Sequence, residues 1–349
     1  MNQLDFASYQ KTNHSFTRKM VYHVGVDCGF FVEMNYMVNA MLYCLEHHVR
    51  FQLYSEDANF GTGVGWSEYF LPFCEEVHEG FHRRYNFHRP PSWRRILKLC
   101  RRKKTVAPIK WKLKCIVKTA VGHLMAIAAY REFVLLNQDV PAFPSPYYCF
   151  RELGIQGGYH EMYGLLASMI WRLHPDVLSQ IELFRCKLEL PPVYDGIHIR
   201  GGDKDSETEL VDGKCIMQAM KKSDGACVFV LTDDYRQILS LQAEYPTLKF
   251  ASLCQPQENG YRHAEFCKQP SMERHSAIVR LLASVDFLLK SRLFVGSITT
   301  GPSVFIMKLR AGQTSVLAVD CPQEELPFAL TQTIDVRAEI SKRNMRRRV

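Results

Sequence analysis

The segment 194–204 reads YDGIHIRGGDK and brings a histidine, an arginine, two glycines and an Asp-Lys pair to the end of one β-branched run. A planar guanidinium can donate several hydrogen bonds to a diphosphate, and glycine lets the backbone approach such a ligand closely. A helical segment at 211–222 and an apolar run at 226–231 follow. The loop after Arg200 would therefore lie at the carboxyl end of a strand, where open α/β sheets bind ligands. Its candidate residues are His198, Arg200, Gly201, Gly202, Asp203 and Lys204.

Each of these residues alone has an ordinary structural explanation. An arginine near a strand end usually forms a surface ion pair, and Asp203 with Lys204 could be a solvated turn. Two glycines beside a charged cluster seldom serve packing alone, so the combination favours a binding loop.

Two further strands of the second half would end in polar residues. The run at 226–231 is followed by a threonine and two aspartates, and a run at 293–296 leads into the turn GSITTGPS. Pro302 suits the first turn of a helix, so hydroxyls and backbone amides at that helix start would face the same side as Arg200. A nucleotide diphosphate would fit this set. The added residues are Thr232, Asp233, Asp234, Gly296, Ser297, Thr299 and Thr300.

The elements that would position these residues alternate between strand and helix, which is typical of a parallel sheet with helices on both faces. We therefore predict an α/β fold with two Rossmann-like domains facing a cleft, at 1–187 and 188–349, with a linker at 188–192 and a basic tail. The expected strands are 21–26, 51–54, 193–199, 226–231, 248–253, 293–296 and 315–319, and the expected helices are 32–46, 211–222, 235–243, 272–289 (capped by Ser271) and 302–309.

The turn after the first strand lacks a Gly-x-Gly-x-x-Gly pattern, so a dinucleotide site is not indicated there. It could shape an acceptor pocket, or it could be an apolar turn that supports the core. Its residues are Asp27, Gly29, Phe30 and Phe31.

Composition is that of a globular protein, and we expect the protein to stay in the cytoplasm. The twelve cysteines lack the two-residue spacing of zinc or redox motifs, and the start lacks the layout of a signal peptide. Buried thiols in a reducing compartment are the expected result.

The net charge of +8 is concentrated in one place, since eleven Lys or Arg and no acid lie between Arg94 and Lys118. A solvated face is the common explanation of such a run. Here it continues into an apolar stripe of helical spacing, so 94–128 could instead form a basic amphipathic helix in peripheral contact with the inner face of a membrane. Nucleic acid is disfavoured, because zinc-finger spacing and an aromatic stacking motif are both absent.

Over about 193–310 the chain resembles the GDP-fucose-dependent fucosyltransferases, which include α-1,6-, peptide O- and rhizobial nodulation enzymes. The resemblance is carried by His198-x-Arg200-x-x-Asp203-Lys204, by Thr232-Asp233-Asp234 and by Gly296-x-x-Thr299-Thr300. It implies a B-type glycosyltransferase fold with an acceptor-side first domain and a nucleotide-sugar-binding second domain. It also implies GDP-fucose as donor, inversion at the fucose anomeric carbon, and neither a cofactor nor a metal ion.

The resemblance also implies roles for single residues. Arg200 would hold the β-phosphate, His198 would contact the guanosine end, and Lys204 would lie by the catalytic pocket. Thr299 and Thr300 would donate hydroxyls to phosphate, where the family usually has serines. Asp233 would shape the nucleoside side.

Two departures from the family pattern bear on specificity. Gly201 stands where many members have a second arginine, which removes one positive charge. At the place of the guanine-contacting aspartate, Ser284 aligns best by spacing, with Asp286 two residues on. A donor with another sugar or base therefore stays an alternative, as does a non-catalytic nucleotide- or glycan-binding partner protein.

An acceptor hydroxyl must lose its proton as it attacks, so a carboxylate near Lys204 should act as base. Glu207 is our first choice, with Glu209 and Asp203 as the others. The acceptor would be a glycan or a lipid-linked oligosaccharide, used in surface polysaccharide or oligosaccharide synthesis.

Overall fold

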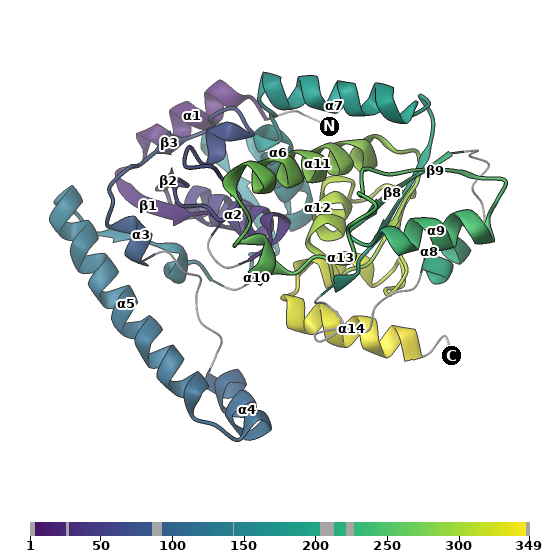
Figure 1. Cartoon of the computed structure of the whole chain (residues 1–349). Coiled ribbons are helices and arrows are strands. Elements are labelled where there is room, and N and C mark those ends of the chain that lie inside the picture. The colour runs from purple at the N-terminus through teal and green to yellow at the C-terminus, as the bar shows by residue number, and fades with distance from the viewer. Residues whose placement is uncertain are drawn as a thin grey trace.

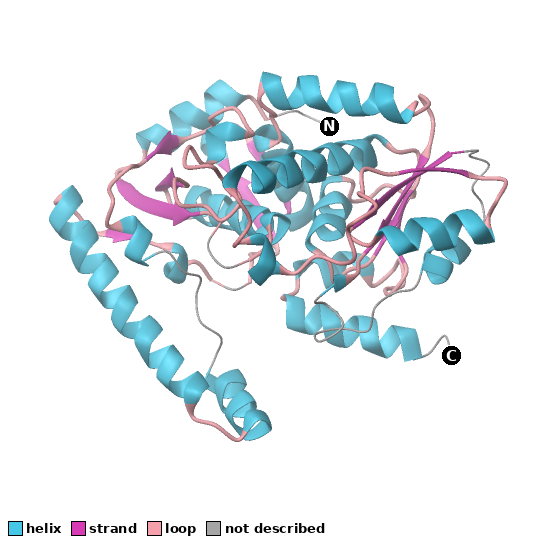
Figure 2. Ribbon diagram, in the orientation of Figure 1, coloured by secondary structure: helices cyan, strands magenta, loops and turns pink. Residues whose placement is uncertain are grey.

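The computed structural model describes residues 4–25, 28–85, 93–141, 143–202, 213–220 and 227–346. Within these residues, two parallel sheets lie side by side with helices around and between them (Figure 1, Figure 2). The first sheet belongs to the first half of the chain and the second sheet to the second half.

The first sheet is a small Rossmann-like unit. Its strand order is β3-β2-β1-β4, and every described pairing is parallel. The crossover helix α2 (Phe30–Glu46) packs a methionine-rich face, including Met34, Met37 and Met41, into the core. The strands are β1 (Arg18–His23), β2 (Val49–Tyr54), β3 (Glu75–Glu76) and β4 (Val134–Leu135).

The second sheet has the order β11-β10-β7-β8-β9, again with parallel pairings. This is the doubly wound order, in which the first strand of the unit lies between its second and its fourth. The strand order reverses between β7 and β10, so this pair forms the topological switch point. The elements are β7 (Asp195–Ile199), α8 (Gly213–Ala219), β8 (Cys227–Thr232), α9 (Tyr235–Glu244), β9 (Lys249–Ala251), α11 (Ser271–Lys290), β10 (Phe294–Gly296), α12 (Gly301–Leu309) and β11 (Val316–Ala318).

The predicted α/β class with two Rossmann-like halves is confirmed by these strand orders. The expected cap at Ser271 is wrong, because Ser271 is the first residue of α11. Pro270, with extended backbone angles, precedes it as the cap residue. Part of the expected helix 211–222 lies outside the described residues, and α8 covers the rest.

One hydrophobic core runs through both halves. Helix α6 (Tyr159–Ile170) and helix α2 of the first half pack against α12 of the second half. At this junction the Phe31 and Phe305 rings lie 5.1 Å apart, and the Lys308 ammonium donates a hydrogen bond of 2.7 Å to the Tyr159 hydroxyl. Helix α7 (Pro175–Leu188) precedes the predicted linker in sequence, yet it packs against α11.

Several elements have no counterpart in the sequence predictions. Along the chain, the antiparallel pair β5 and β6 follows the first sheet. Helices α13 and α14 follow the second sheet (Figure 1). These elements are α1 (Phe6–Ser15), α3 (His82–Tyr85), β5 (Tyr147–Phe150), β6 (Ile155–Gly158), α10 (His263–Phe266), α13 (Leu326–Thr331) and α14 (Ile334–Arg346), together with β3, β4, α6 and α7 described above.

The basic segment forms a helical hairpin of α4 (Trp93–Lys103) and α5 (Ala107–Tyr130). Figure 1 shows this hairpin extending away from the two sheets, with α4 at its far end.

Candidate nucleotide-binding site

At the switch point of the second sheet, a histidine side chain contacts two hydroxyl groups. His198 lies on β7, and its Nδ1 atom is 2.7 Å from Oγ of Ser303 and 3.2 Å from Oγ1 of Thr300. Thr300 is the cap residue of α12 and Ser303 lies in its first turn. The imidazole therefore joins the end of β7 to the amino end of α12, across the strand pair where the sheet order reverses.

His198 is neutral at pH 7. Burial lowers the pKa of its imidazole from 6.5 to about 3, and the positive charge of Arg200 acts in the same direction. Because the ring is neutral, the positive potential of this region comes from Arg200 and from the helix dipole of α12.

The turn before α12 is fixed from a third strand. Asp320 follows β11 and is fully buried, and its carboxylate accepts hydrogen bonds from the Ser297 hydroxyl at 2.7 Å and the Ile298 amide at 3.0 Å. The Ser297 hydroxyl also lies 2.7 Å from Oγ1 of Thr299. Gly296 lies so close to Ser303 that a Cβ atom there would come within 2.5 Å of its Oγ. The hydroxyls of this turn are thus held in place by the protein itself.

Arg200 is held by a carboxylate and an aromatic ring. Its Nη1 atom lies 3.0 Å from Oδ2 of Asp233, and its guanidinium carbon lies 4.9 Å from the centre of the Tyr261 ring. Such cation–π contacts and ion pairs fix the direction of a guanidinium, whose N–H donors form a planar fork.

Asp233 holds the described start of the loop after β7. Its Oδ1 accepts from the Gly201 amide at 2.7 Å, and its Oδ2 accepts from the Tyr261 amide at 2.9 Å. Its backbone carbonyl accepts from the Gly260 amide at 2.7 Å. One aspartate therefore ties the arginine loop to a second loop at 255–263.

The two loops touch through glycines. Gly202 and Gly260 have φ values of +69° and +116°, and a Cβ on Gly202 would lie 2.2 Å from the Tyr261 carbonyl oxygen. A Cβ on Gly260 would lie 2.7 Å from the Gly202 backbone. Only glycine combines these angles with this approach.

The two neighbours of Asp233 have roles in local structure. Asp234 caps α9 by accepting from the Arg236 amide, and its carboxylate pairs with the Arg236 guanidinium at 2.6 Å. The Arg236 hydrogen bond lowers the pKa of Asp234. The Thr232 hydroxyl lies 3.2 Å from the Asp234 amide, from which it accepts.

Ser284 and Asp286 form hydrogen bonds within their own helix, α11. The Ser284 hydroxyl donates to the Arg280 carbonyl at 2.8 Å, and the Asp286 carboxylate pairs with Lys290 at 2.7 Å. The α11 side chain that reaches the 255–263 loop is Arg280, whose guanidinium lies 2.6 Å from Glu258.

The predicted acceptor-side turn packs into the core. Gly29 is the cap residue of α2, and Phe30 and Phe31 are 5% and 2% exposed. The start of α2 meets the start of α12, where a Cβ on Gly301 would lie 3.2 Å from Val32. This is the packing expected of an apolar turn that supports the core.

Some predicted residues lie outside the described part of the chain. They are Asp27, Asp203, Lys204, Glu207 and Glu209.

The 255–263 loop and its partners were missed by the sequence predictions. The Tyr261 hydroxyl lies 2.9 Å from Nδ1 of His263, and Nε2 of His263 lies 3.5 Å from the Asn59 amide nitrogen in the first half. The loop therefore connects the arginine site to the other half of the protein. The Asn259-Gly260 dipeptide, a strong turn signal, could have indicated a tight loop here.

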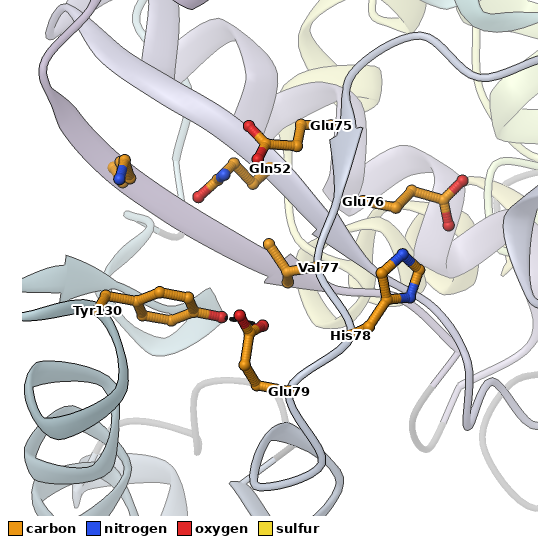
Figure 3. A pocket seen from close by; sticks show the side chains of 8 residues that line it. Gln52, Glu75, Glu76, Val77, His78, Glu79 and Tyr130 are labelled. Carbon is orange, nitrogen blue, oxygen red and sulfur yellow. Dashed lines mark hydrogen bonds between the residues drawn. The ribbon is translucent and has the colours of Figure 1, made fainter.

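A separate pocket lies at the edge of the first sheet. Figure 3 shows Glu75, Glu76 and Glu79 around it, with the Tyr130 hydroxyl donating to Glu79 at 2.5 Å. None of its lining residues belongs to the Arg200 cluster, so we do not assign the nucleotide to it. Among the described residues, no group of three His, Cys, Asp or Glu side chains is placed to hold a metal ion.

The fold and the site define an α/β protein of two Rossmann-like halves, with hydroxyls at the switch point and an arginine held at the neighbouring end of β7 and β8. No protein-family model matches the sequence, and no curated protein matches it. Solved structures are similar in fold. NodZ α-1,6-fucosyltransferase co-crystallised with GDP is 12% identical, with a TM-score of 0.48 over 84% of this chain and 92% of that one.

Two further structures give similar values. POFUT1 in complex with GDP is 12% identical with a TM-score of 0.45, covering 86% of this chain and 98% of that chain. A mutant of Arabidopsis thaliana FUT1 in complex with GDP is 10% identical with a TM-score of 0.49, covering 91% and 75%.

Proposed function

We propose that this protein is a cytoplasmic, inverting glycosyltransferase that moves fucose from GDP-fucose to a hydroxyl of a glycan or lipid-linked oligosaccharide, without a metal ion. The product would serve surface polysaccharide or oligosaccharide synthesis. The observation that supports a nucleotide site most directly is the contact of His198 with Thr300 and Ser303 at the switch point. Ligands of doubly wound sheets bind in the crevice outside the strand ends at that point.

The site offers the groups that a diphosphate needs. The amino end of α12 provides backbone amides and a positive dipole end, and the hydroxyls of Thr299 and Thr300 lie at its start. Arg200 comes from the neighbouring strand β7 and is oriented by Asp233. Because His198 is neutral, it can position the hydroxyls at the start of α12 without forming an ion pair with the phosphate itself.

In the reaction, negative charge grows on the leaving diphosphate as the bond to the sugar breaks. A guanidinium held in place stabilises this charge more in the transition state than in the ground state. We expect Arg200→Ala to lower kcat by about 100-fold or more, by analogy with the loss of other charge-stabilising donors. Arg236→Ala is the matched control, since Arg236 pairs with Asp234 and is largely exposed.

The acceptor hydroxyl needs a base, and we propose Glu207 for this role, with Glu209 and Asp203 as alternatives. Incubation with GDP-fucose and candidate oligosaccharides should give fucosylated product, which Glu207→Gln should abolish. Full activity in Glu207→Gln, Glu209→Gln and Asp203→Asn alike would place the base elsewhere. No transfer to any acceptor, with GDP still bound, would favour a non-catalytic nucleotide-binding partner protein.

A donor with another base is a second candidate. It is favoured by the observation that the Asp286 carboxylate is paired with Lys290 on its own helix. Calorimetry with GDP, UDP and dTDP separates the two. GDP binding at least tenfold tighter than the others supports guanine, and equal binding would contradict it.

A further inference from the structure

The hairpin of α4 and α5 presents an apolar stripe to its surroundings. Along α5, large apolar side chains recur every three or four residues on one face, which is the spacing of an amphipathic helix. They are more exposed than core side chains would be. The stripe consists of Leu113 (51% exposed), Ile116 (46%), Val117 (61%), Leu124 (65%) and Ile127 (41%).

Positive charge flanks this stripe, and two exposed tryptophans lie elsewhere on the hairpin. Eleven Lys or Arg and no acidic residue lie between Arg94 and Lys118. Without this segment the formal net charge of the chain changes from +8 to −3 (8 − 11). Trp93 and Trp111 are each 46% exposed. Tryptophan is enriched at membrane–water interfaces, and basic residues are attracted to anionic lipids.

Another face of α5 packs on the rest of the protein. Near its carboxyl end Ala126 is fully buried, in a cluster with Val134. His123 lies 3.4 Å from Asp139, and the Tyr130 hydroxyl lies 2.7 Å from Nε2 of His82. These contacts fix the base of the hairpin on the first sheet, so the stripe is not the core-facing side of α5.

The far end of the hairpin is held by α4. Ile96 of α4 is fully buried, and the Lys112 ammonium lies 4.7 Å from the centre of the Trp93 ring. The two helices thus form one unit, on which the stripe and the basic residues keep a fixed arrangement.

We propose that this hairpin docks the protein on an anionic lipid bilayer, with α5 lying in the plane of the interface. The stripe would enter the boundary between head groups and acyl chains, and Lys110 and Lys114 would face lipid phosphates. A partner of this chemistry matches both the apolar area and the absence of acidic residues, whereas a second copy of the chain would bring the same positive charges against each other. The proposal rests on this surface alone and is independent of the sugar-transfer proposal.

A membrane-spanning α5 fits the structure less well. By length and composition α5 is a candidate span, and 17% of its most apolar window is buried. Its uncharged part, 119–130, is about 18 Å long at 1.5 Å per residue, whereas a span needs about 20 apolar residues. Insertion would also separate Ala126 and His123 from the first sheet.

Flotation of the full chain with vesicles tests the docking. We expect the protein to float with phosphatidylcholine vesicles that contain phosphatidylglycerol, much less with phosphatidylcholine alone, and less as salt is raised. Leu113→Ser/Val117→Ser/Leu124→Ser and Lys110→Glu/Lys114→Glu should each lower partitioning by about tenfold or more. Leu183→Ser and Lys187→Glu, exposed changes on α7, are the controls and should bind like the wild type.

Brominated lipid gives a second measurement. Trp93 and Trp111 should be quenched on binding and the fully buried Trp66 should not, so Trp93→Phe/Trp111→Phe should remove most of the quenching. Four results would overturn the proposal. They are no flotation of the wild type, equal flotation of all variants, a dimer that the stripe variant dissociates, and association that survives alkaline carbonate, which would show a span instead of in-plane docking. GDP calorimetry without vesicles reports on the nucleotide site alone, so the two proposals fail separately.

Discussion

The guanidinium of Arg200 and the carboxylate of Asp233 form an ion pair, with Nη1 of the arginine 3.0 Å from Oδ2 of the aspartate. The same Oδ2 accepts from the Tyr261 amide, and Oδ1 accepts from the Gly201 amide. The pair therefore sets both the direction of the arginine and the contact between the two loops that surround it.

Replacing Asp233 by Asn should disturb the loops even though the shape of the side chain is kept. The amide nitrogen of the new side chain would take the place of either Oδ1 or Oδ2. It would then face a backbone N–H group that donates to that oxygen in the wild type. A lost acceptor of this kind costs about 1–3 kcal/mol in the free energy of unfolding. Urea unfolding measures this cost, and calorimetry should show weaker GDP binding. Asp176→Asn, at an exposed site on α7, is the control. Equal stability of Asp233→Asn and the wild type would mean that the loop does not depend on this carboxylate.

Gly202→Ala should be more destabilising than Gly154→Ala. Both glycines have a left-handed backbone, with φ of +69° and +65°. At Gly154 a Cβ has open space, whereas at Gly202 it would lie 2.2 Å from the Tyr261 carbonyl oxygen. The control should lose about 1–2 kcal/mol from the backbone angle alone. Gly202→Ala should lose clearly more and should also weaken nucleotide binding. Similar losses in both variants would show that the loops do not touch in solution.

The switch-point residues were predictable from sequence because strand ends in a parallel sheet share one edge. That rule needs only the order of the elements along the chain, and it suffices to place Arg200 and Thr300 at the same edge. The 255–263 loop was not predictable in this way, since its position depends on two glycine backbones, Gly202 and Gly260, that are far apart in the chain. The spacing along α11 likewise did not indicate that Arg280, one turn before Ser284, contacts this loop.

The neutrality of His198 predicts a specific dependence of stability on pH. Its pKa is about 3 in the folded protein and 6.5 when unfolded, so below pH 6.5 the unfolded chain binds a proton that the folded protein does not. Stability from this residue is complete above pH 6.5 and falls by up to about 1.4 kcal/mol per pH unit down to about pH 3. Urea unfolding at pH 7.5 and 5.5 should show this loss in the wild type.

His198→Asn is the variant that isolates the effect, since Asn keeps a hydrogen-bonding group near the position of Nδ1 but does not titrate. It should be less stable than the wild type at pH 7.5 and should lose less on acidification. Some loss should persist, because burial also lowers the pKa of His82 to about 4. An unchanged slope in His198→Asn would show that this imidazole is exposed to water in the folded protein.

Asp320 should be needed for the turn before α12, which we propose as part of the diphosphate site. Its carboxylate is fully buried and accepts from the Ser297 hydroxyl and the Ile298 amide. Asp320→Ala leaves both donors without this acceptor, which should cost about 2–4 kcal/mol in the free energy of unfolding. GDP affinity should fall with it, because the Thr299 hydroxyl is held through Ser297. Asp320→Asn should retain most of the stability and most of the GDP affinity. The carbonyl of the new side chain can accept from the Ile298 amide while its NH2 group donates to the Ser297 hydroxyl. If the two variants bind GDP like the wild type while unfolding more easily, the turn is a packing feature and the diphosphate must be held elsewhere.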